Sequence, residues 1–202
     1  MGDTKLKKLS LTAAVLVCGF LGLAANAQQL DFGFGYSTTT AAGPTVSSST
    51  LLELPSMKGG GYPSFSADFL TRRRLGLEGE MSWRGHQNLY GGNQPYRPIF
   101  WAFNAIWAPK LSKNFTAEVL GGIGAEDLRF YGITSCSSYY LCTNYASSNH
   151  FMGDFGAGLR AYVWHDVFIR PEVREYLINN NQEFSSGHVT RYGATLGYSF
   201  GR

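Results

Sequence analysis

Two stretches of the chain place serine, histidine and acidic residues close together in the sequence. A serine hydroxyl becomes a nucleophile when a neighbouring histidine takes its proton and an acidic group orients that histidine. Serine and histidine are also common in polar loops, and no motif here fixes their geometry. We therefore expect loop residues, and we predict that the chain is not an enzyme. The two candidate sets are Ser147, Ser148, His150 and Asp154, and Glu183, Ser185, Ser186 and His188.

The N-terminus has the three parts of a secretion signal, which we predict over residues 1–27. Three lysines precede an apolar stretch at 9–23, and an Ala-Asn-Ala cleavage site follows at 25–27. An uncleaved membrane anchor is less favoured, because the stretch is short and is interrupted by polar and glycine residues. The mature chain, 28–202, then forms one domain of about 175 residues.

Removal of the signal would leave only two cysteines, Cys136 and Cys142. Outside the cytoplasm, such a close pair is expected to form a disulfide. The bridge would fix a small loop rather than the whole fold. A zinc site would need two more ligands at suitable spacing, which the sequence does not offer. We predict no metal and no cofactor.

Charge and hydropathy exclude two broad classes of protein. The chain has 17 Lys and Arg and 14 Asp and Glu, but three of these basic residues and one acidic residue belong to the signal. The mature chain is therefore close to neutral, which gives no case for binding nucleic acid. No mature segment has about 18 consecutive apolar residues, so a membrane-spanning helix is excluded. Aromatic residues make up 15% of the chain and glycine accounts for 25 of 202 residues, which favours closely packed strands.

Eight segments have the length and the apolar–polar alternation of membrane-spanning strands. The connections alternate between short turns and longer loops rich in Ser, Thr, Gly, Asn and Tyr, as in a barrel with both termini on the periplasmic side. We predict an all-β fold, an eight-stranded antiparallel up-and-down transmembrane β-barrel. Pro171 cannot donate a ladder hydrogen bond, so we expect a bulge or local distortion there. The segments are 30–39, 62–71, 75–84, 97–108, 115–126, 149–163, 167–178 and 188–200.

Alternation alone does not tell which face of the strands points inward. A soluble lipocalin-like barrel would turn its apolar phase inside. Three features favour the opposite arrangement: charges of both signs recur on the polar phase, the final strand ends on the aromatic Phe200, and further aromatic residues lie near strand ends, where membrane girdles occur. These aromatic residues are Trp83, Trp107, Trp164 and Tyr198. The segment 97–108 is apolar on both phases apart from Asn104, and its orientation stays open.

The polar phase would place ten charged residues inside the barrel. Eight strands leave an interior just wide enough to be filled by side chains. We favour a structural network of paired charges over a narrow gated ion path, and a general-diffusion porin would need about sixteen strands. The ten residues are Glu78, Glu80, Arg84, Glu118, Asp154, Arg160, Arg170, Glu172, Arg174 and Arg191.

The last three strands resemble the small OmpA-type outer-membrane β-barrel proteins, in particular the single-barrel members without a peptidoglycan-binding domain. The resemblance is carried by FGAGLRAYVW at 155–164, FIRPEVREY at 168–176 and RYGATLGYSF at 191–200. Gly201 and Arg202 trail the terminal aromatic, whereas many family members end on it. The resemblance implies a location in the Gram-negative cell outer membrane, contacts with outer-membrane lipid and lipopolysaccharide, and insertion by the barrel-assembly machinery. It transfers no catalytic residues.

From these observations we expect a monomeric outer-membrane protein with a structural or surface-binding role. Envelope integrity, adhesion and ligand sensing through the long loops all fit, and the extracellular ligand is unknown. The alternatives are a barrel enzyme that modifies lipid A or phospholipid, for which the serine and histidine sets would be needed, and a narrow gated pore.

Overall fold

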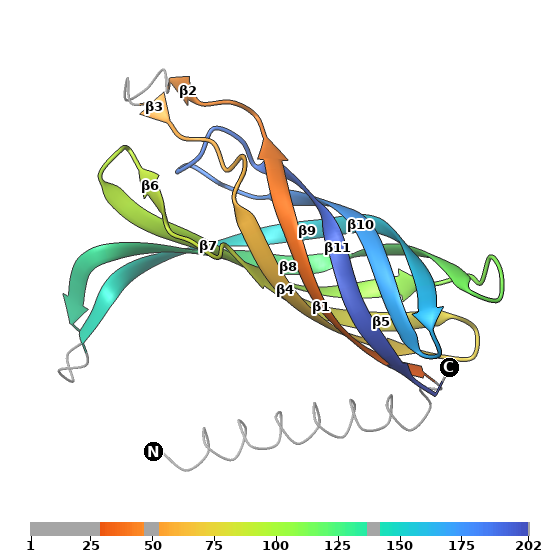
Figure 1. Ribbon diagram of the computed structural model, residues 1–202. Helices are drawn as coiled ribbons and strands as arrows, with labels where there is room; N and C mark the ends of the chain where they lie inside the picture. The colour runs from red at the N-terminus through yellow and green to blue at the C-terminus, as the bar shows by residue number, and fades with distance from the viewer. Residues whose placement is uncertain (1–28, 47–52, 137–141, 202) are drawn as a thin grey trace, which may run out of the picture.

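The computed structural model describes residues 29–46, 53–136 and 142–201. Eight long antiparallel strands form one closed sheet, in which β5 pairs with β7 to complete the circle (Figure 1). The prediction of an eight-stranded up-and-down barrel is confirmed. No helix in the described part of the chain is both long and apolar enough to span a membrane. The eight strands are β1 (Gln29–Ala41), β4 (Gly61–Leu70), β5 (Leu75–Trp83), β7 (Gln94–Trp107), β8 (Phe115–Cys136), β9 (Cys142–Trp164), β10 (Val167–Ile178) and β11 (His188–Phe200). The predicted signal, 1–27, lies outside the described residues.

The first and last strands pair with each other along nearly their whole length. The register runs from Leu30 opposite Phe200 to Ala41 opposite Val189. All three short turns and the C-terminus lie at one end of the barrel, and the longer connections lie at the other (Figure 1). In the barrels that this topology resembles, the end with short turns is the periplasmic end.

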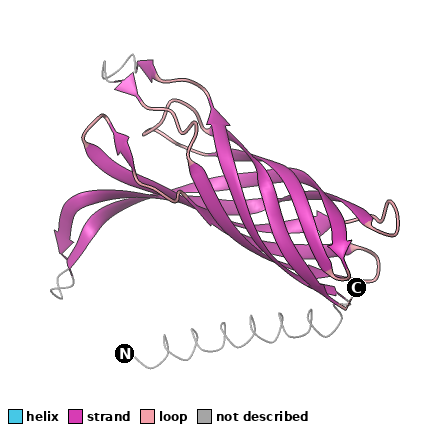
Figure 2. Cartoon of the chain, in the orientation of Figure 1, coloured by secondary structure: helices cyan, strands magenta, loops and turns pink. Residues whose placement is uncertain are grey.

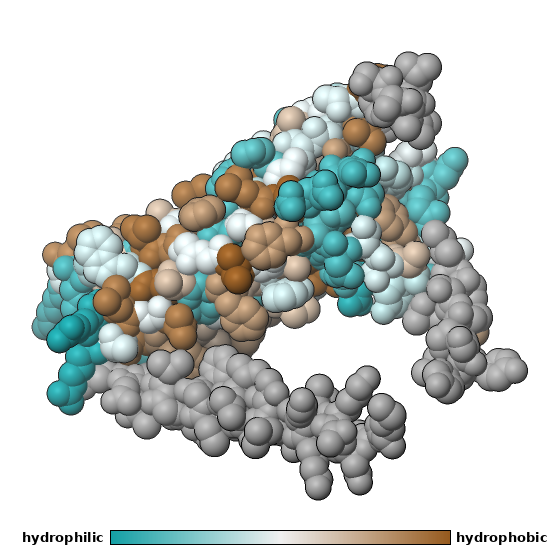
Figure 3. All heavy atoms as spheres, turned by 180° about the vertical axis from the view of Figure 1, so that it is seen from behind, coloured by the Kyte–Doolittle hydropathy of each residue, from teal (hydrophilic) through white to brown (hydrophobic). Residues whose placement is uncertain are grey.

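The apolar phase of the strands faces outward, as the sequence predicts. Phe34 and Leu196, for example, are 62% and 59% exposed, whereas Arg160 on the opposite phase is fully buried. Figure 3 shows one side of this wall as mainly brown and tan residues. An outer surface this apolar is favourable only next to hydrocarbon, and we call it the apolar belt. Its members include Phe32, Phe34, Phe65, Leu77, Met81, Trp101, Phe103, Trp107, Val119, Ile123, Phe151, Phe155, Val163, Ile169, Val173, Leu196 and Tyr198.

The interior has three layers along the barrel axis. A small apolar cluster of Leu70, Ile106, Ala108 and Leu120 lies near the short turns. Charged side chains fill the middle, and a larger aromatic cluster closes the opposite end. β7 contributes apolar residues to both end layers, which explains why its two phases look alike in the sequence: Phe100 and Ile106 point inward, and Trp101 and Phe103 point outward.

The segment 127–148, which we expected to be a loop, is largely strand. β8 and β9 continue beyond the barrel as a ribbon formed by 127–136 and 142–150, and β7 stays paired with its β8 side as far as Phe130 (Figure 2). Leu128 on its inner face is fully buried, and Tyr131 and Tyr145 meet across the pair with ring centroids 6.1 Å apart. These contacts help to keep the two strands paired beyond the barrel. Three further short strands lie in the long connections: β2 (Thr45–Val46), β3 (Glu53–Leu54) and β6 (Asn88–Tyr90).

Of the bulge or local distortion expected at Pro171, the structure shows a local distortion and no bulge. Its pairing with Ala194 of β11 is regular, and on the β9 side the ladder is interrupted at 170–171 without a change of register. The register shift in β10 lies instead between Val167 and Phe168, beside the turn from β9. The missing donor of Pro171 therefore produces only a local interruption.

Candidate functional site

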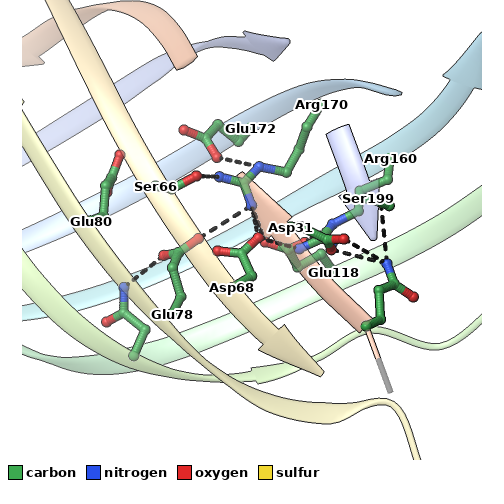
Figure 4. A network of polar contacts seen from close by, with 12 residues as sticks. Asp31, Ser66, Asp68, Glu78, Glu80, Glu118, Arg160, Arg170, Glu172 and Ser199 are labelled. Atoms are coloured by element: carbon green, nitrogen blue, oxygen red, sulfur yellow. Dashed lines mark hydrogen bonds and ion pairs between the residues drawn. The ribbon is translucent and has the colours of Figure 1, made fainter. Parts of the chain in front are cut away.

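The half of the charged interior nearer the short turns is organised around Arg160 and Arg170 (Figure 4). Arg160 donates to Asp68 at 2.6 Å and also to Asp31 and Glu118. Arg170 bridges the same Asp68 and Glu118 at 3.1 and 3.0 Å. Each guanidinium thus meets carboxylates from several strands at once, because its planar fork presents five donors.

The half of the charged interior nearer the longer connections is organised around Arg174 and Arg191. Arg174 lies 2.7 Å from Glu78, 2.9 Å from Glu80 and 3.1 Å from Asp154. Arg191 pairs with Glu80 and with Glu172, the latter at 3.0 Å. Arg170 connects the two halves through Glu78 at 3.2 Å and Glu172 at 3.0 Å. The ion pairs therefore form one continuous group, the lumen network: Asp31, Asp68, Glu78, Glu80, Glu118, Asp154, Arg160, Arg170, Glu172, Arg174 and Arg191.

The lumen network is not balanced in charge. Within the described residues it contains seven carboxylates and four guanidinium groups. Arginine keeps its charge in proteins, so four guanidiniums cannot neutralise seven ionised carboxylates. Asn104 stabilises two of these carboxylates, since its side-chain amide donates to Glu78 and Asp154. Where the surplus carboxylates are ionised, they favour cations over anions in the lumen, and where they are protonated they add no charge.

Nine of the ten charged residues that the sequence predicts to share the interior belong to this network, and Arg84 does not. Arg84 lies one residue beyond the end of β5, where its guanidinium is 5.9 Å from the ring centroids of Tyr62 and Tyr96. Arg84 is buried inside the barrel, but its contacts are aromatic rings rather than carboxylates, because it lies at the level of the aromatic side chains and beyond the charged layer. The sequence interpretation also missed Asp31 and Asp68, whose place on the polar phase of β1 and β4 was the available signal.

An aromatic plug, which we call the mouth cluster, closes the end opposite the short turns. Two of its members come from connections: Met57 precedes β4, and Phe184 lies between β10 and β11. The two connections are joined where the Ser185 N–H donates to the Pro55 carbonyl at 3.0 Å. The mouth cluster comprises Met57, Tyr62, Tyr96, Phe100, Ala102, Leu128, Met152, Tyr176, Ile178, Phe184 and Val189. Since these side chains are nearly all fully buried, the cluster separates the lumen network from the outside.

Ser148, His150 and Glu183 meet beside the mouth cluster, although the sequence assigned them to two different sets. Ser148 Oγ donates to Glu183 Oε1 at 2.8 Å and lies 3.0 Å from His150 Nε2, and Glu183 Oε2 lies 3.1 Å from that same nitrogen. In a working triad the acid holds one ring nitrogen and the serine meets the other. Here both meet Nε2, and the serine proton points to the carboxylate rather than to the histidine. Asn149, Asn179 and Gln182 complete the polar hollow of about 410 Å³ beside these residues.

The other members of the two sets lie elsewhere. Asp154 belongs to the lumen network, and His188 is exposed, with its Nδ1 3.5 Å from Glu175. Ser186 bonds only locally, accepting from the His188 N–H at 3.0 Å, and Ser185 is held to the first long connection. Neither predicted set therefore brings all four of its residues together at one site.

Cys142 is disulfide-bonded, and its backbone lies directly opposite that of Cys136 near the tip of the ribbon. The bond is therefore located outside the barrel wall. In the described part of the chain, no group of three or more His, Cys, Asp or Glu residues is arranged to hold a metal ion.

The outer face of the ribbon carries arginine and tyrosine. Arg129 lies opposite Arg97 of β7 and stacks over Tyr145, with its guanidinium carbon 5.0 Å from the ring centroid. Arg97 lies over Tyr131 at 6.0 Å. These four residues share the strand phase of the apolar belt but lie beyond it, and Asp127 at 2.9 Å orients Arg129. We call Arg97, Arg129, Tyr131 and Tyr145 the ribbon face.

No protein-family model and no curated protein sequence matches the chain. Solved structures of small outer-membrane barrels do match it. Neisserial surface protein A is 10% identical with a TM-score of 0.58, and the aligned region covers 85% of this chain and 96% of that one. The attachment invasion locus protein Ail of Yersinia pestis is 14% identical with a TM-score of 0.53, at 85% and 98% coverage. The N-terminal barrel of Pseudomonas aeruginosa OprF is 12% identical, with a TM-score of 0.53 at 86% and 98% coverage. The chain therefore has the fold of the small eight-stranded outer-membrane barrels.

Proposed function

We propose that this protein is an integral outer-membrane barrel that binds a partner at the cell surface through its ribbon. The barrel itself acts as a rigid anchor. The apolar belt supports the membrane location, since a fold with buried charges and an exposed apolar wall is stable only in lipid. The similar structures are outer-membrane proteins as well, and they share the fold.

The observation that carries the surface-binding role is the ribbon, which extends the β7–β8–β9 sheet beyond the barrel while the lumen network and the mouth cluster fill and close the interior. A closed interior leaves the outer end as the place for recognition. Loops and extensions on a rigid scaffold are where binding residues concentrate.

The ribbon face suits an anionic polysaccharide. Each guanidinium presents charge-assisted donors to sulfate or phosphate groups, and the tyrosine rings beside it offer flat surfaces for sugar rings. The Yersinia pestis protein Ail was crystallised in complex with a heparin analogue, sucrose octasulfate. That complex supports the choice of a sulfated polysaccharide as the first partner to examine.

The test is binding of the purified protein in lipid nanodiscs to immobilised heparin. The double variant Arg97→Ala/Arg129→Ala should bind at least tenfold more weakly, and binding by the unaltered chain should weaken as salt is added. The variant Lys110→Ala/Lys113→Ala removes two positive charges at the opposite end of the barrel and should bind normally. Equal binding by all three proteins would count against the ribbon face.

A narrow cation path is the second candidate function, and the excess of carboxylates in the lumen network is the observation that favours it. The mouth cluster and the tightly bonded arginines argue against a continuous path, so we expect no single-channel steps in planar bilayers. Cation-selective steps that change on Glu80→Gln would support the pore instead.

A further inference from the structure

A groove of about 510 Å³ runs along the outer wall of the barrel over β4, β5 and β7. Its floor is formed by three small residues on neighbouring strands, Ala67 of β4, Gly79 of β5 and Ala105 of β7. Ala67 lies directly opposite Gly79, and Ala105 lies opposite Leu77. Larger side chains flank this floor, namely Phe69, Leu77 and Phe103. The groove thus results from small residues placed between bulky ones within the apolar belt.

The position of the groove decides what can fill it. It lies in the half of the belt nearest the short turns, since its lining extends to Thr71 and Gly76 on either side of the β4–β5 turn. Glu78 and Asn104 also border the groove, but their side chains are buried on the lumen side and bond to each other there. Water would therefore find few polar partners on the lining, and the surroundings are hydrocarbon. An acyl chain is the occupant that matches both the lining and the location, and the volume is in the range of ligand sites.

The β4–β5 turn places positive charge directly at the end of the groove. Arg72 and Arg73 are exposed there, and neither has an acidic partner among the described residues. Arg74 takes a different course, because its backbone is left-handed (φ 62°) and its side chain donates to Gln29 at 2.7 Å, at the entrance of the lumen. The turn therefore leaves two arginines free at the level where phospholipid headgroups lie.

We propose that the groove and this turn form a binding site for an anionic phospholipid of the periplasmic leaflet. One acyl chain lies along Ala67, Gly79 and Ala105, and the headgroup phosphate is bound by Arg72 and Arg73. The proposal rests on the outer-membrane location proposed above. It is independent of the ribbon face, which lies at the other end of the barrel.

Native mass spectrometry of the protein released from mixed vesicles tests the site. The vesicles contain equal amounts of phosphatidylglycerol and phosphatidylcholine, and retained lipids are counted. We expect one phosphatidylglycerol to be retained preferentially. Arg72→Gln/Arg73→Gln should reduce that preference about fivefold for each arginine removed. The matched control is Lys110→Gln/Lys113→Gln, because these residues line a separate hollow with His165 and Asp166, and it should keep the preference.

Variants that fill the groove separate the acyl-chain contact from the headgroup contact. Gly79→Leu should reduce retention of both lipids, since a β-carbon at Gly79 meets only the Phe103 ring, at 3.6 Å, and the longer side chain enters the groove. Ala67→Phe provides a second filling variant should Gly79→Leu fold poorly.

Three outcomes would overturn the proposal. These are equal retention of the two lipids by the unaltered chain, unchanged retention in both filling variants, or a dimer that both filling variants disrupt while no lipid is bound, which would make a second barrel the occupant. Heat-modifiable migration on gels reports insertion separately. A chain that does not insert into the vesicles at all would contradict the outer-membrane location rather than the site.

Discussion

At the scale of single residues, Arg174 shows what the lumen network demands of one side chain. It contacts four carboxylates, those of Glu78, Glu80, Asp154 and Glu172, and is itself fully buried. Arg174→Leu would leave these groups without their shared cation, and breaking a buried ion pair costs about 3–5 kcal/mol. We expect a loss of this size in urea unfolding of the protein in lipid.

Arg129→Leu is the matched control for that experiment, because it removes the same side chain from a partly exposed ion pair with Asp127. Exposed pairs contribute about 0–1 kcal/mol. If both variants lost the same stability, the lumen network would not be the source of the barrel's resistance to unfolding.

His150 provides a second prediction at this scale. Ser148 and Glu183 both meet its Nε2, so it is not arranged to take a proton from the serine. The unaltered protein and the variant His150→Ala should therefore both leave lipid acylation unchanged when they are expressed in a heterologous outer membrane. The measurement is the acylation pattern of lipid A and phospholipid by mass spectrometry, compared with cells lacking the protein. An acyl change present in the unaltered protein and absent in His150→Ala would establish an enzyme.

The lumen residues also show how far sequence reasoning reaches. Strand phase identified the inward side of each charged strand, because alternation in a closed sheet admits only two faces. It could not tell which arginines pair with Asp31 and Asp68, since ion pairs across a barrel join strands that are distant in sequence. Phase also could not tell that buried Arg84 meets aromatic rings instead of carboxylates, because it does not show where along the barrel axis one interior layer ends and the next begins.

At the scale of elements, the ribbon is the part that the sequence hid. The expected loop is rich in Ser and Tyr, and its apolar residues were too few to indicate a strand. Its strands are held by contacts between them and with β7, for example Tyr96 opposite Phe130. Such non-local contacts cannot be read from the local pattern of a polar segment.

The disulfide leads to a prediction about this element. Closing a loop of about seven residues removes roughly 2–3 kcal/mol of unfolded-chain entropy. Because the bond lies near the ribbon tip, replacing Cys136 and Cys142 with Ser should loosen the ribbon and leave the barrel intact. Hydrogen exchange should rise over 127–136 and 142–150 but not over β10 or β11, and gel migration should stay heat-modifiable. Loss of barrel insertion would show that the bond supports the whole fold.

At the scale of the whole molecule, the fold followed from the sequence because three regularities agree. The predicted strand lengths match a bilayer, the connections alternate between short and long, and a polar or charged phase lies opposite an apolar one in every predicted strand except 97–108. A soluble barrel would need the reverse orientation, and the exposure of Phe34 and Leu196 against the burial of Arg160 excludes it. The lipid-facing groove was beyond reach, since it depends on which small residues of β4, β5 and β7 become neighbours across the sheet.

Leu196 tests the orientation of the whole barrel. It projects outward from the middle of β11, between Phe34 of β1 and Ile169 of β10, and is 59% exposed. Leu196→Arg would place a charge in hydrocarbon, which costs about 2–4 kcal/mol near the bilayer midplane. Insertion into vesicles should therefore become slower and unfolding easier. Ser147→Arg, on the exposed ribbon beyond the belt, adds the same charge in water and should insert normally. Leu196→Cys should in turn react with lipid-phase labels. A chain in which Leu196→Arg inserts as readily as Ser147→Arg, and Leu196→Cys resists those labels, would have its faces inverted, with the charged phase towards lipid.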